Sequence, residues 1–246
     1  MIVRPDGDSW LLVRQEDHAA LAADLLSHWQ ADGVPDRPTR ATLLDATRLH
    51  DCGWLDEDDR PSVDPALGAP WDFVHLPISR RQAVWLRAMT RLDDRPHIAA
   101  LVAHHALTAY NRFERDPAWG GFFRTMASER DRRVSALAQD GRSGVAFDSF
   151  LRDYALLRLA DLVSLTLCHG WSDAFEVDYY RAVPDGATLT LTPDPFGGAI
   201  VPWRVAARRI PRRHYASDTD LRDTVDAAPV DWLDGFLQGL AVPLPS

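Results

Sequence analysis

Hydrophobic residues recur about every three to four positions over most of the first 170 residues, which is the spacing of amphipathic helices. The last helical segment is apolar on nearly every face, so we expect it at the centre of the fold. Residues 52–78 are irregular and rich in Asp and Pro, and a loop of this kind can form the rim or lid of a site. The pattern predicts helices at about 17–30, 38–51, 79–92, 96–110, 120–139 and 147–169.

Alternating apolar and polar positions predict strands near both ends of the chain. Residues 2–4 and 10–13 flank a Pro- and Gly-containing turn, which indicates an N-terminal hairpin. Residues 188–192 and 199–206 flank a second such turn and indicate a C-terminal hairpin. We expect the two hairpins to pair. The predicted fold is therefore mainly α, a helical bundle with a small antiparallel β-sheet formed by the N- and C-terminal hairpins.

The sequence indicates a single domain over residues 1–246, because no linker, repeat or low-complexity tract divides it. Its helical core would span about 15–170, with a C-terminal β-hairpin appendage at about 185–215. Two cysteines, Cys52 and Cys168, are too few for a disulfide scaffold. The net charge of −9 argues against a nucleic-acid or acidic-membrane surface, and no apolar run approaches the roughly 20 residues of a membrane span. Without a secretory pattern at the start, we expect a cytoplasmic protein.

The pair His50-Asp51 is the strongest chemical signal in the sequence. It ends the helix predicted at 38–51, and Gly53 follows as a helix stop signal. A neutral imidazole and a carboxylate on adjacent residues can both ligate one metal ion where the backbone turns. Alone the pair is weak evidence, because most such pairs are surface residues, so its meaning depends on the other residues of metal-ligand type.

Three further metal-ligand residues lie on apolar helix faces: His18, His105 and Asp161. Each has an ordinary alternative, since a single buried His is usually a hydrogen-bonded core residue. Asp161 could be satisfied by Arg158 or by a helix N-terminus. An ionised carboxylate on an apolar helix is otherwise unfavourable by several kcal/mol. Taken together, the residue types and their order favour a metal site.

The order His, His-Asp, His-His, Asp, with each group on its own helix, resembles the HD superfamily of metal-dependent phosphohydrolases. The whole chain also resembles the DUF3891 family, from residue 1 to at least 170, although that family's name carries no chemistry. The stretches that carry this second resemblance are Met1-Ile2-Val3-Arg4, Gln15-Glu16-Asp17-His18-Ala19, His50-Asp51-Cys52-Gly53-Trp54, Pro65-Ala66-Leu67-Gly68-Ala69-Pro70 and Ala160-Asp161-Leu162-Val163-Ser164-Leu165.

The HD resemblance implies an HD-like helical fold in which His18, His50, Asp51 and Asp161 ligate the metal. His104 and His105 fall where dinuclear members supply a further ligand, and His75 lies where such members often place another. His105 is the better candidate of the adjacent pair, because it continues the apolar stripe of its helix.

Asp51 and His105 are the candidate catalytic residues. Subgroups with one metal often carry a Glu three residues after the Asp of the pair, but Trp54 stands there in this chain. The general acid or base therefore stays unassigned.

Three functions are consistent with this ligand set. The first is hydrolysis of a phosphoester of a small molecule or nucleotide, using one or two ions of Fe, Mn, Co, Ni or Zn. The second is oxidative cleavage of a small polar substrate by a di-iron site, with four His and two Asp as ligands. The third is a non-enzymatic sensor or binding protein that keeps the metal as structure. We expect a small-molecule substrate, with no nucleic-acid or membrane partner and with the oligomeric state left open. The ligands of the di-iron site would be His18, His50, Asp51, His75, His105 and Asp161.

Five arginines cluster near the end of the second predicted hairpin. Arginine suits bidentate binding of phosphate or carboxylate. The more ordinary interpretation is charge that protects an exposed strand edge. The five are Arg204, Arg208, Arg209, Arg212 and Arg213.

Overall fold

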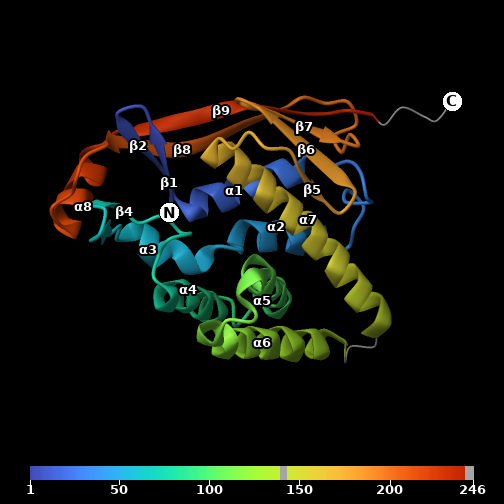
Figure 1. Cartoon of the computed structure of the whole chain (residues 1–246). Coiled ribbons are helices and arrows are strands. Elements are labelled where there is room, and N and C mark those ends of the chain that lie inside the picture. The colour runs from blue at the N-terminus through green and yellow to red at the C-terminus, as the bar shows by residue number, and fades with distance from the viewer. Residues whose placement is uncertain (139–142, 242–246) are drawn as a thin grey trace.

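A curved sheet lies over a set of helices in this computed structural model, which describes residues 1–138 and 143–241 (Figure 1). Helices α1 and α7 lie directly against the sheet, and α4, α5 and α6 lie farther from it. Each helix predicted from the hydrophobic spacing is present, with boundaries shifted by a few residues. They are α1 (Gln15–Ser27), α2 (Arg40–Leu49), α4 (Ile78–Arg91), α5 (Pro96–Ala109), α6 (Gly120–Ala138) and α7 (Ser143–His169).

Several shorter elements connect these helices, and the hydrophobic spacing did not predict them. Within the segment expected to be irregular, a helical turn, a short helix and a two-stranded sheet follow the His50-Asp51 pair. They are η1 (Cys52–Trp54), α3 (Leu55–Asp59), β3 (Val63–Asp64) and β4 (Ala69–Pro70). Two more turns, η2 (Asn111–Phe113) and η3 (Pro117–Trp119), lead from α5 to α6, and α8 (Asp218–Ala227) lies at one end of the large sheet.

The large sheet has seven strands in the described part of the chain, in the order β1-β2-β8-β9-β7-β6-β5. All neighbouring strands are antiparallel except β7 and β9, which are parallel. The strands are β1 (Ile2–Asp6), β2 (Ser9–Val13), β5 (Phe175–Val177), β6 (Tyr180–Asp185), β7 (Thr188–Thr192), β8 (Val201–Pro211) and β9 (Val230–Gly239).

The prediction of a mainly α fold with a small sheet is wrong, because the fold is mixed α/β with one large sheet. The N-terminal hairpin exists and β2 does pair with β8. The predicted C-terminal hairpin does not exist, since β9 lies between β7 and β8. Alternation along a strand reveals which face is buried but not which strand is its neighbour, so the inserted strand could not be read from the pattern.

Helix α7 occupies the centre of the fold, as its apolar character predicted. It contacts strands of the sheet on one side and α1, α2, α5 and α6 on others. Side chains on different faces, including Leu157 and Leu159, are buried. Any polar group on this helix near its middle is therefore removed from solvent. Among the described residues, no helix is both long and apolar enough to cross a membrane.

The arginines after residue 203 make contacts within the fold. The strand-edge interpretation is wrong, because β8 is an interior strand between β2 and β9. Arg208 donates to main-chain carbonyls of Val225 and Ala228, and Arg213 pairs with Asp220. The rest of the cluster stacks on Trp rings or pairs with Asp side chains: Arg204 on Trp232, Arg212 on Trp10, and Arg209 with Asp6 and Asp231.

The position of β9 inside the sheet can be tested with two substitutions on adjacent residues. Leu237 is fully buried and faces the helices' side of the core, whereas 54% of Phe236 is exposed. Leu237→Ala should lower the free energy of unfolding by about 2–5 kcal/mol, because it leaves a cavity. Phe236→Ala should change it by less than about 1 kcal/mol. Urea denaturation measures both, and equal effects would contradict an interior β9.

Candidate metal centre

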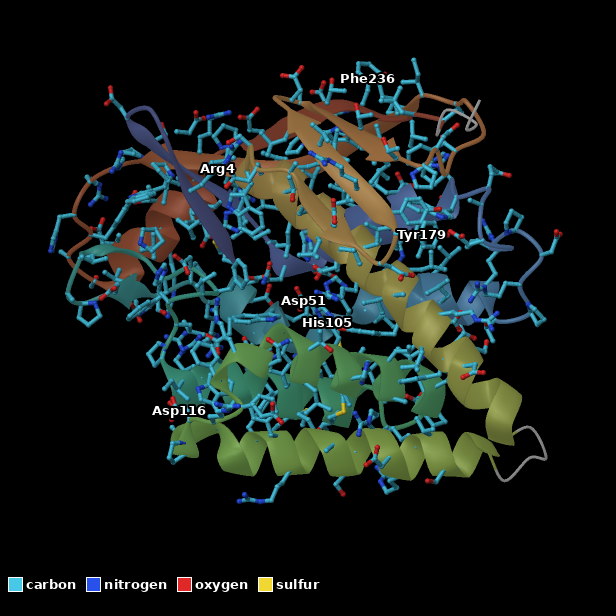
Figure 2. The ribbon with its side chains drawn as sticks, turned by 45° about the vertical axis from the view of Figure 1, so that its right-hand side comes forward. Arg4, Asp51, His105, Asp116, Tyr179 and Phe236 are labelled. Carbon is cyan, nitrogen blue, oxygen red and sulfur yellow. The ribbon has the colours of Figure 1, made fainter. Side chains whose placement is uncertain are left out.

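Five side chains of metal-ligand type meet where α1, α2, α5 and α7 pack against one another. The carboxylate of Asp161 is the hub of this centre. Its Oδ1 lies 3.2 Å from Nε2 of His18 and 3.3 Å from Nε2 of His50, and its Oδ2 lies 3.7 Å from Nε2 of His105. Oδ2 of Asp51 lies 3.5 Å from Nε2 of both His18 and His50. Figure 2 shows Asp51 and His105 close together in the interior.

These five residues form two overlapping groups with the spacing of metal ligands. Within each group, one ligand atom from every residue lies within 4.8 Å of the others. His50 belongs to both groups, so the groups are contiguous. All five side chains are buried. The groups are His18, His50 and Asp51, and His50, His105 and Asp161.

Hydrogen bonds on the far side of two rings fix which nitrogen faces the centre. Nδ1 of His50 donates to the carbonyl oxygen of Thr47 at 2.7 Å. The hydroxyl of Ser164 donates to the carbonyl of Asp161, which leaves its oxygen to accept from Nδ1 of His18 at 2.6 Å. Both rings thus carry a proton on Nδ1, and in the neutral form each presents the lone pair of Nε2 to the carboxylates.

The unsatisfied atoms of the centre fit a divalent cation. Nε2 of His18 and Nε2 of His50 are buried and face carboxylate oxygens at 3.2–3.5 Å, but neither nitrogen meets hydrogen-bond geometry with a partner among the described residues. Buried nitrogen atoms of this kind are unfavourable unless something binds them. Two imidazole lone pairs facing two carboxylates form a donor set suited to Fe, Mn, Co, Ni or Zn. The residues therefore could hold a metal ion.

The ionisation of the centre also favours a bound cation. Burial alone would raise the pKa of Asp161, but the close approach of His18 and His50 holds that pKa well below its usual range. Burial alone would lower the pKa of His50, yet the Asp51 and Asp161 carboxylates raise it to about 9. Without a metal, a proton on imidazole therefore balances the two carboxylates. A metal ion would take over that role and release the proton.

His105 differs from the other two histidines. Its burial lowers its pKa to about 4, so its ring is neutral near pH 7. Its Nδ1 is buried without a hydrogen-bond partner among the described residues, and its ring lies against that of Trp85, with centroids 5.7 Å apart. A neutral imidazole at the edge of the centre can ligate a metal without first losing a proton.

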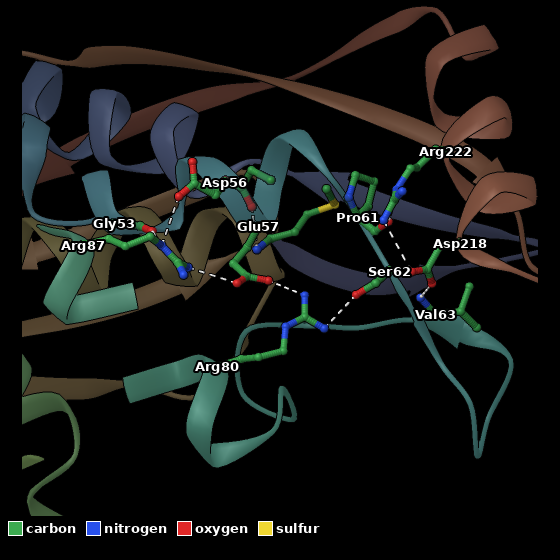
Figure 3. Close-up of polar contacts among 12 residues, drawn as sticks. Gly53, Asp56, Glu57, Pro61, Ser62, Val63, Arg80, Arg87, Asp218 and Arg222 are labelled. Carbon is green, nitrogen blue, oxygen red and sulfur yellow. Dashed lines mark hydrogen bonds and ion pairs between the residues drawn. The ribbon is translucent and has the colours of Figure 1, made fainter. Parts of the chain in front are cut away.

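The chain that follows Asp51 is held in place by helix α4 (Figure 3). Arg91 donates to the carbonyl of Cys52 at 2.6 Å, and Arg87 donates to the carbonyl of Gly53 at 3.2 Å. Gly53 is required because a Cβ there would lie 2.0 Å from the carbonyl oxygen of Val84. This close approach fixes the turn that directs Asp51 inward.

Acidic residues just beyond this turn pair with arginines of the same helix. Glu57 binds both Arg80 and Arg87, and Asp56 binds Arg87 (Figure 3). Asp56 also binds Arg91. The side chain of Glu57 is mostly buried, so the pairs are partly shielded from solvent. Asp56 and Glu57 thus pair with arginines of α4 and do not belong to the metal centre.

A cavity of about 100 Å³ opens beside the centre, with Asp51, His105 and Asp161 in its wall. The loop predicted as the rim of a site contributes Trp54, Phe73 and Val74 to this wall, so that part of the loop lies where it was expected. The other lining residues are Gln15, Arg81, Trp85, Ala109, Tyr110, Arg112 and Leu165.

Two of the predicted ligands lie apart from the centre. His75 is 73% exposed, and its Nδ1 bonds to the carboxylate of Asp72. The ring of His104 packs against that of Tyr154, with centroids 4.3 Å apart, and its Nδ1 lies 3.4 Å from the guanidinium of Arg130. Neither residue belongs to a potential metal group in the described part of the chain.

The alternative partner for Asp161 is not used. Arg158 is exposed, and the ion pairs that Asp161 makes within the described residues are with histidines. The interpretation that this arginine satisfies the buried carboxylate is therefore wrong.

Sequence reasoning missed Ser164 and Gln15 as parts of the site. Both lie three residues from a predicted ligand on the same helix, Ser164 after Asp161 and Gln15 before His18. That spacing places each on the face of its ligand, which is the signal that could have identified them.

The fold and the centre define a mixed α/β protein with a buried His/Asp cluster that could hold a metal ion. The chain belongs to the DUF3891 family, described as a protein of unknown function, whose family model matches residues 1–212. Comparison with curated proteins and with solved structures finds no significant match.

Adjacent histidines on α5 provide a matched test of the centre. His105→Gln should weaken the binding of Mn²⁺ or Zn²⁺ at least about tenfold, because a buried imidazole beside Asp161 is lost. His104→Gln should bind the metal as the unsubstituted protein does. Isothermal titration calorimetry measures the affinities, and thermal melting verifies the fold of each variant. A larger loss in His104→Gln than in His105→Gln would contradict this assignment.

The orientation of His18 can be tested through its partner. Ser164→Ala should weaken metal binding by about 10–100-fold, because Nδ1 of His18 loses its acceptor. Thr166→Val is the control, since the Thr166 hydroxyl donates to the carbonyl of Leu162 in its own helix and touches no ligand of the centre among the described residues. Equilibrium dialysis with Zn²⁺ gives the affinities. If both variants bind equally well, the serine does not orient the imidazole.

Proposed function

We propose that this protein is a metal-dependent hydrolase that cleaves a phosphoester of a small molecule or nucleotide. The observation that carries the proposal is the cavity beside the centre, whose wall includes Asp51, His105 and Asp161. Catalytic metal sites keep a position open to substrate, whereas structural sites are closed by protein ligands. A ligand set that borders a cavity therefore favours an enzyme over a sensor that keeps the metal as structure.

The choice of phosphoester chemistry is supported by the order of the ligands along the chain. His18, the His50-Asp51 pair and Asp161 follow the pattern of the HD superfamily, most of whose members are phosphohydrolases. In that superfamily these four positions are the metal ligands. The resemblance supports the proposal through residue order alone. The fold adds no support, because a large seven-stranded sheet stands where a helical bundle with a small sheet was expected.

A divalent ion held here would lower the pKa of a bound water and neutralise charge that develops on a substrate oxygen. His18, His50, His105 and Asp161 would hold the ion, with Ser164 orienting the imidazole of His18 and Thr47 that of His50. Asp51, which also lines the cavity, is the candidate for proton transfer.

The di-iron oxygenase has weaker support. It needs six ligands, and the sixth would be His75, whose ring is exposed and bonded to Asp72. The remaining five residues are sufficient for hydrolysis with one ion. We therefore favour the hydrolase.

The proposal predicts phosphatase activity with a defined dependence on two histidines. With Mn²⁺, Co²⁺, Ni²⁺, Zn²⁺ or Fe²⁺, the protein should release p-nitrophenol from a phosphomonoester or phosphodiester of p-nitrophenol. His50→Ala should lower kcat by at least about 100-fold, because the ion is lost. His75→Ala should keep the activity, whereas an oxygenase with six ligands would need that residue.

Metal analysis of protein purified without chelators completes this test. Two irons per chain, oxygen uptake with a candidate substrate and no release of p-nitrophenol with any divalent ion would overturn the hydrolase. One ion per chain with metal-dependent release would support it.

A further inference from the structure

We propose that Arg81 and Arg112 bind a phosphate group of the substrate in the cavity beside the metal centre. This inference rests on the proposed function and specifies which residues recognise the substrate. Both arginines line the same cavity as Asp51, His105 and Asp161. Arginine presents a planar fork of N–H donors that matches the oxygen atoms of phosphate.

Neither guanidinium is neutralised by the protein. No carboxylate of the described residues lies within ion-pair distance of Arg81 or Arg112. Other arginines of α4, the helix of Arg81, do pair with acidic residues that follow the His50-Asp51 pair. Arg80 and Arg87 bind Glu57 (Figure 3), and Arg91 binds Asp56. Nε of Arg81 is buried and has no hydrogen-bond acceptor in the described structure. The two arginines without an ion pair among the described residues thus line the cavity, whereas the three paired arginines of α4 do not.

Aromatic rings hold the two guanidinium groups in position. The guanidinium carbon of Arg81 lies 5.3 Å from the ring centroid of Trp119 and 5.6 Å from that of Phe113. The guanidinium carbon of Arg112 lies 4.7 Å from the same Phe113 ring. Contacts of this kind stabilise the cation through the ring face and use none of its N–H groups. The donors of both arginines stay available for an anion.

Arg81 also lies close to the metal centre along helix α4. Trp85, whose ring contacts His105, follows Arg81 by four residues on the same face of α4, which is about 6 Å along the helix. An anion at Arg81 would therefore lie close to the ligands. The volume of about 100 Å³ is small compared with the ~300–1,000 Å³ of pockets for drug-sized ligands. The cavity suits a compact group such as phosphate.

Gln15 adds a neutral acceptor to this cavity. Its side chain is 1% exposed, and its Oε1 has no donor among the described residues. A buried carbonyl oxygen without a donor is unfavourable. A hydroxyl or amino group beside the phosphate of the substrate would satisfy this oxygen.

The test measures binding of inorganic phosphate to the Mn²⁺-loaded protein by isothermal titration calorimetry. Arg81→Gln and Arg112→Gln should each weaken binding by about tenfold or more, because charge-assisted hydrogen bonds are lost. Arg115→Gln is the matched control, since Arg115 is exposed, carries the same charge and does not line the cavity. It should bind phosphate within about twofold of the unsubstituted protein. Acetate as a second titrant distinguishes phosphate recognition from recognition of any carboxylate.

Arg112→Gln is the decisive variant, because Arg112 is exposed and its loss leaves the core intact. Unchanged phosphate affinity in Arg112→Gln and in folded Arg81→Gln would overturn the inference, as would equal effects of all three substitutions. Tighter binding of acetate than of phosphate would overturn it as well.

Failure of the proposed hydrolysis would give a different result. Phosphate binding would still depend on Arg81 and Arg112, but no phosphoester would be cleaved. Failure of the inference alone would leave hydrolysis in place, with the KM of p-nitrophenyl phosphate unchanged in both variants.

Discussion

Two carboxylates buried among helices impose the main constraint on this structure. Asp51 and Asp161 lie in the interior, where an isolated charge is unfavourable by several kcal/mol. Three imidazoles surround them: α1, α5 and α7 contribute one of the five residues each, and the turn after α2 contributes His50 and Asp51. The central position of α7 explains why Asp161 has no solvent to stabilise it. The cluster therefore depends on cations, whether protons on imidazole or a metal ion.

The position of Asp51 among the imidazoles depends on the turn that follows it. Helix α4 packs so closely on Gly53 that no larger side chain fits there. Three arginines of α4 bind carbonyl and carboxylate groups of the residues that follow Asp51. The same helix carries Arg81 on the side of the cavity. One helix thus fixes the turn that presents Asp51 and carries, on the wall of the same cavity, an arginine that has no ion pair in the described part of the chain.

The helices and the convergence of five polar residues were accessible from the sequence, because helical periodicity is a local property and a polar residue on an apolar face needs a partner. The sheet was not accessible, since strand pairing joins distant segments. Strand β9 also lacks the alternation of a half-buried strand, because Trp232 and Phe236 are apolar residues on its exposed face. His75 follows the residue order of a dinuclear site, yet Asp72 three residues earlier provides a local partner. Arg81 was not predicted because its lack of a partner is visible only in three dimensions.

The place of β9 in the sheet has a consequence for how the chain is made. Strands β1, β2 and β8 form one half of the sheet and β7, β6 and β5 form the other, and β9 alone joins them. The strand is the last along the described chain, so the sheet becomes continuous only after residue 239 has been synthesised. Until then, β8 and β7 each present an unpaired edge, the kind of edge that pairs with other chains. The fold thus leaves a growing chain open to association with its neighbours until β9 closes the gap.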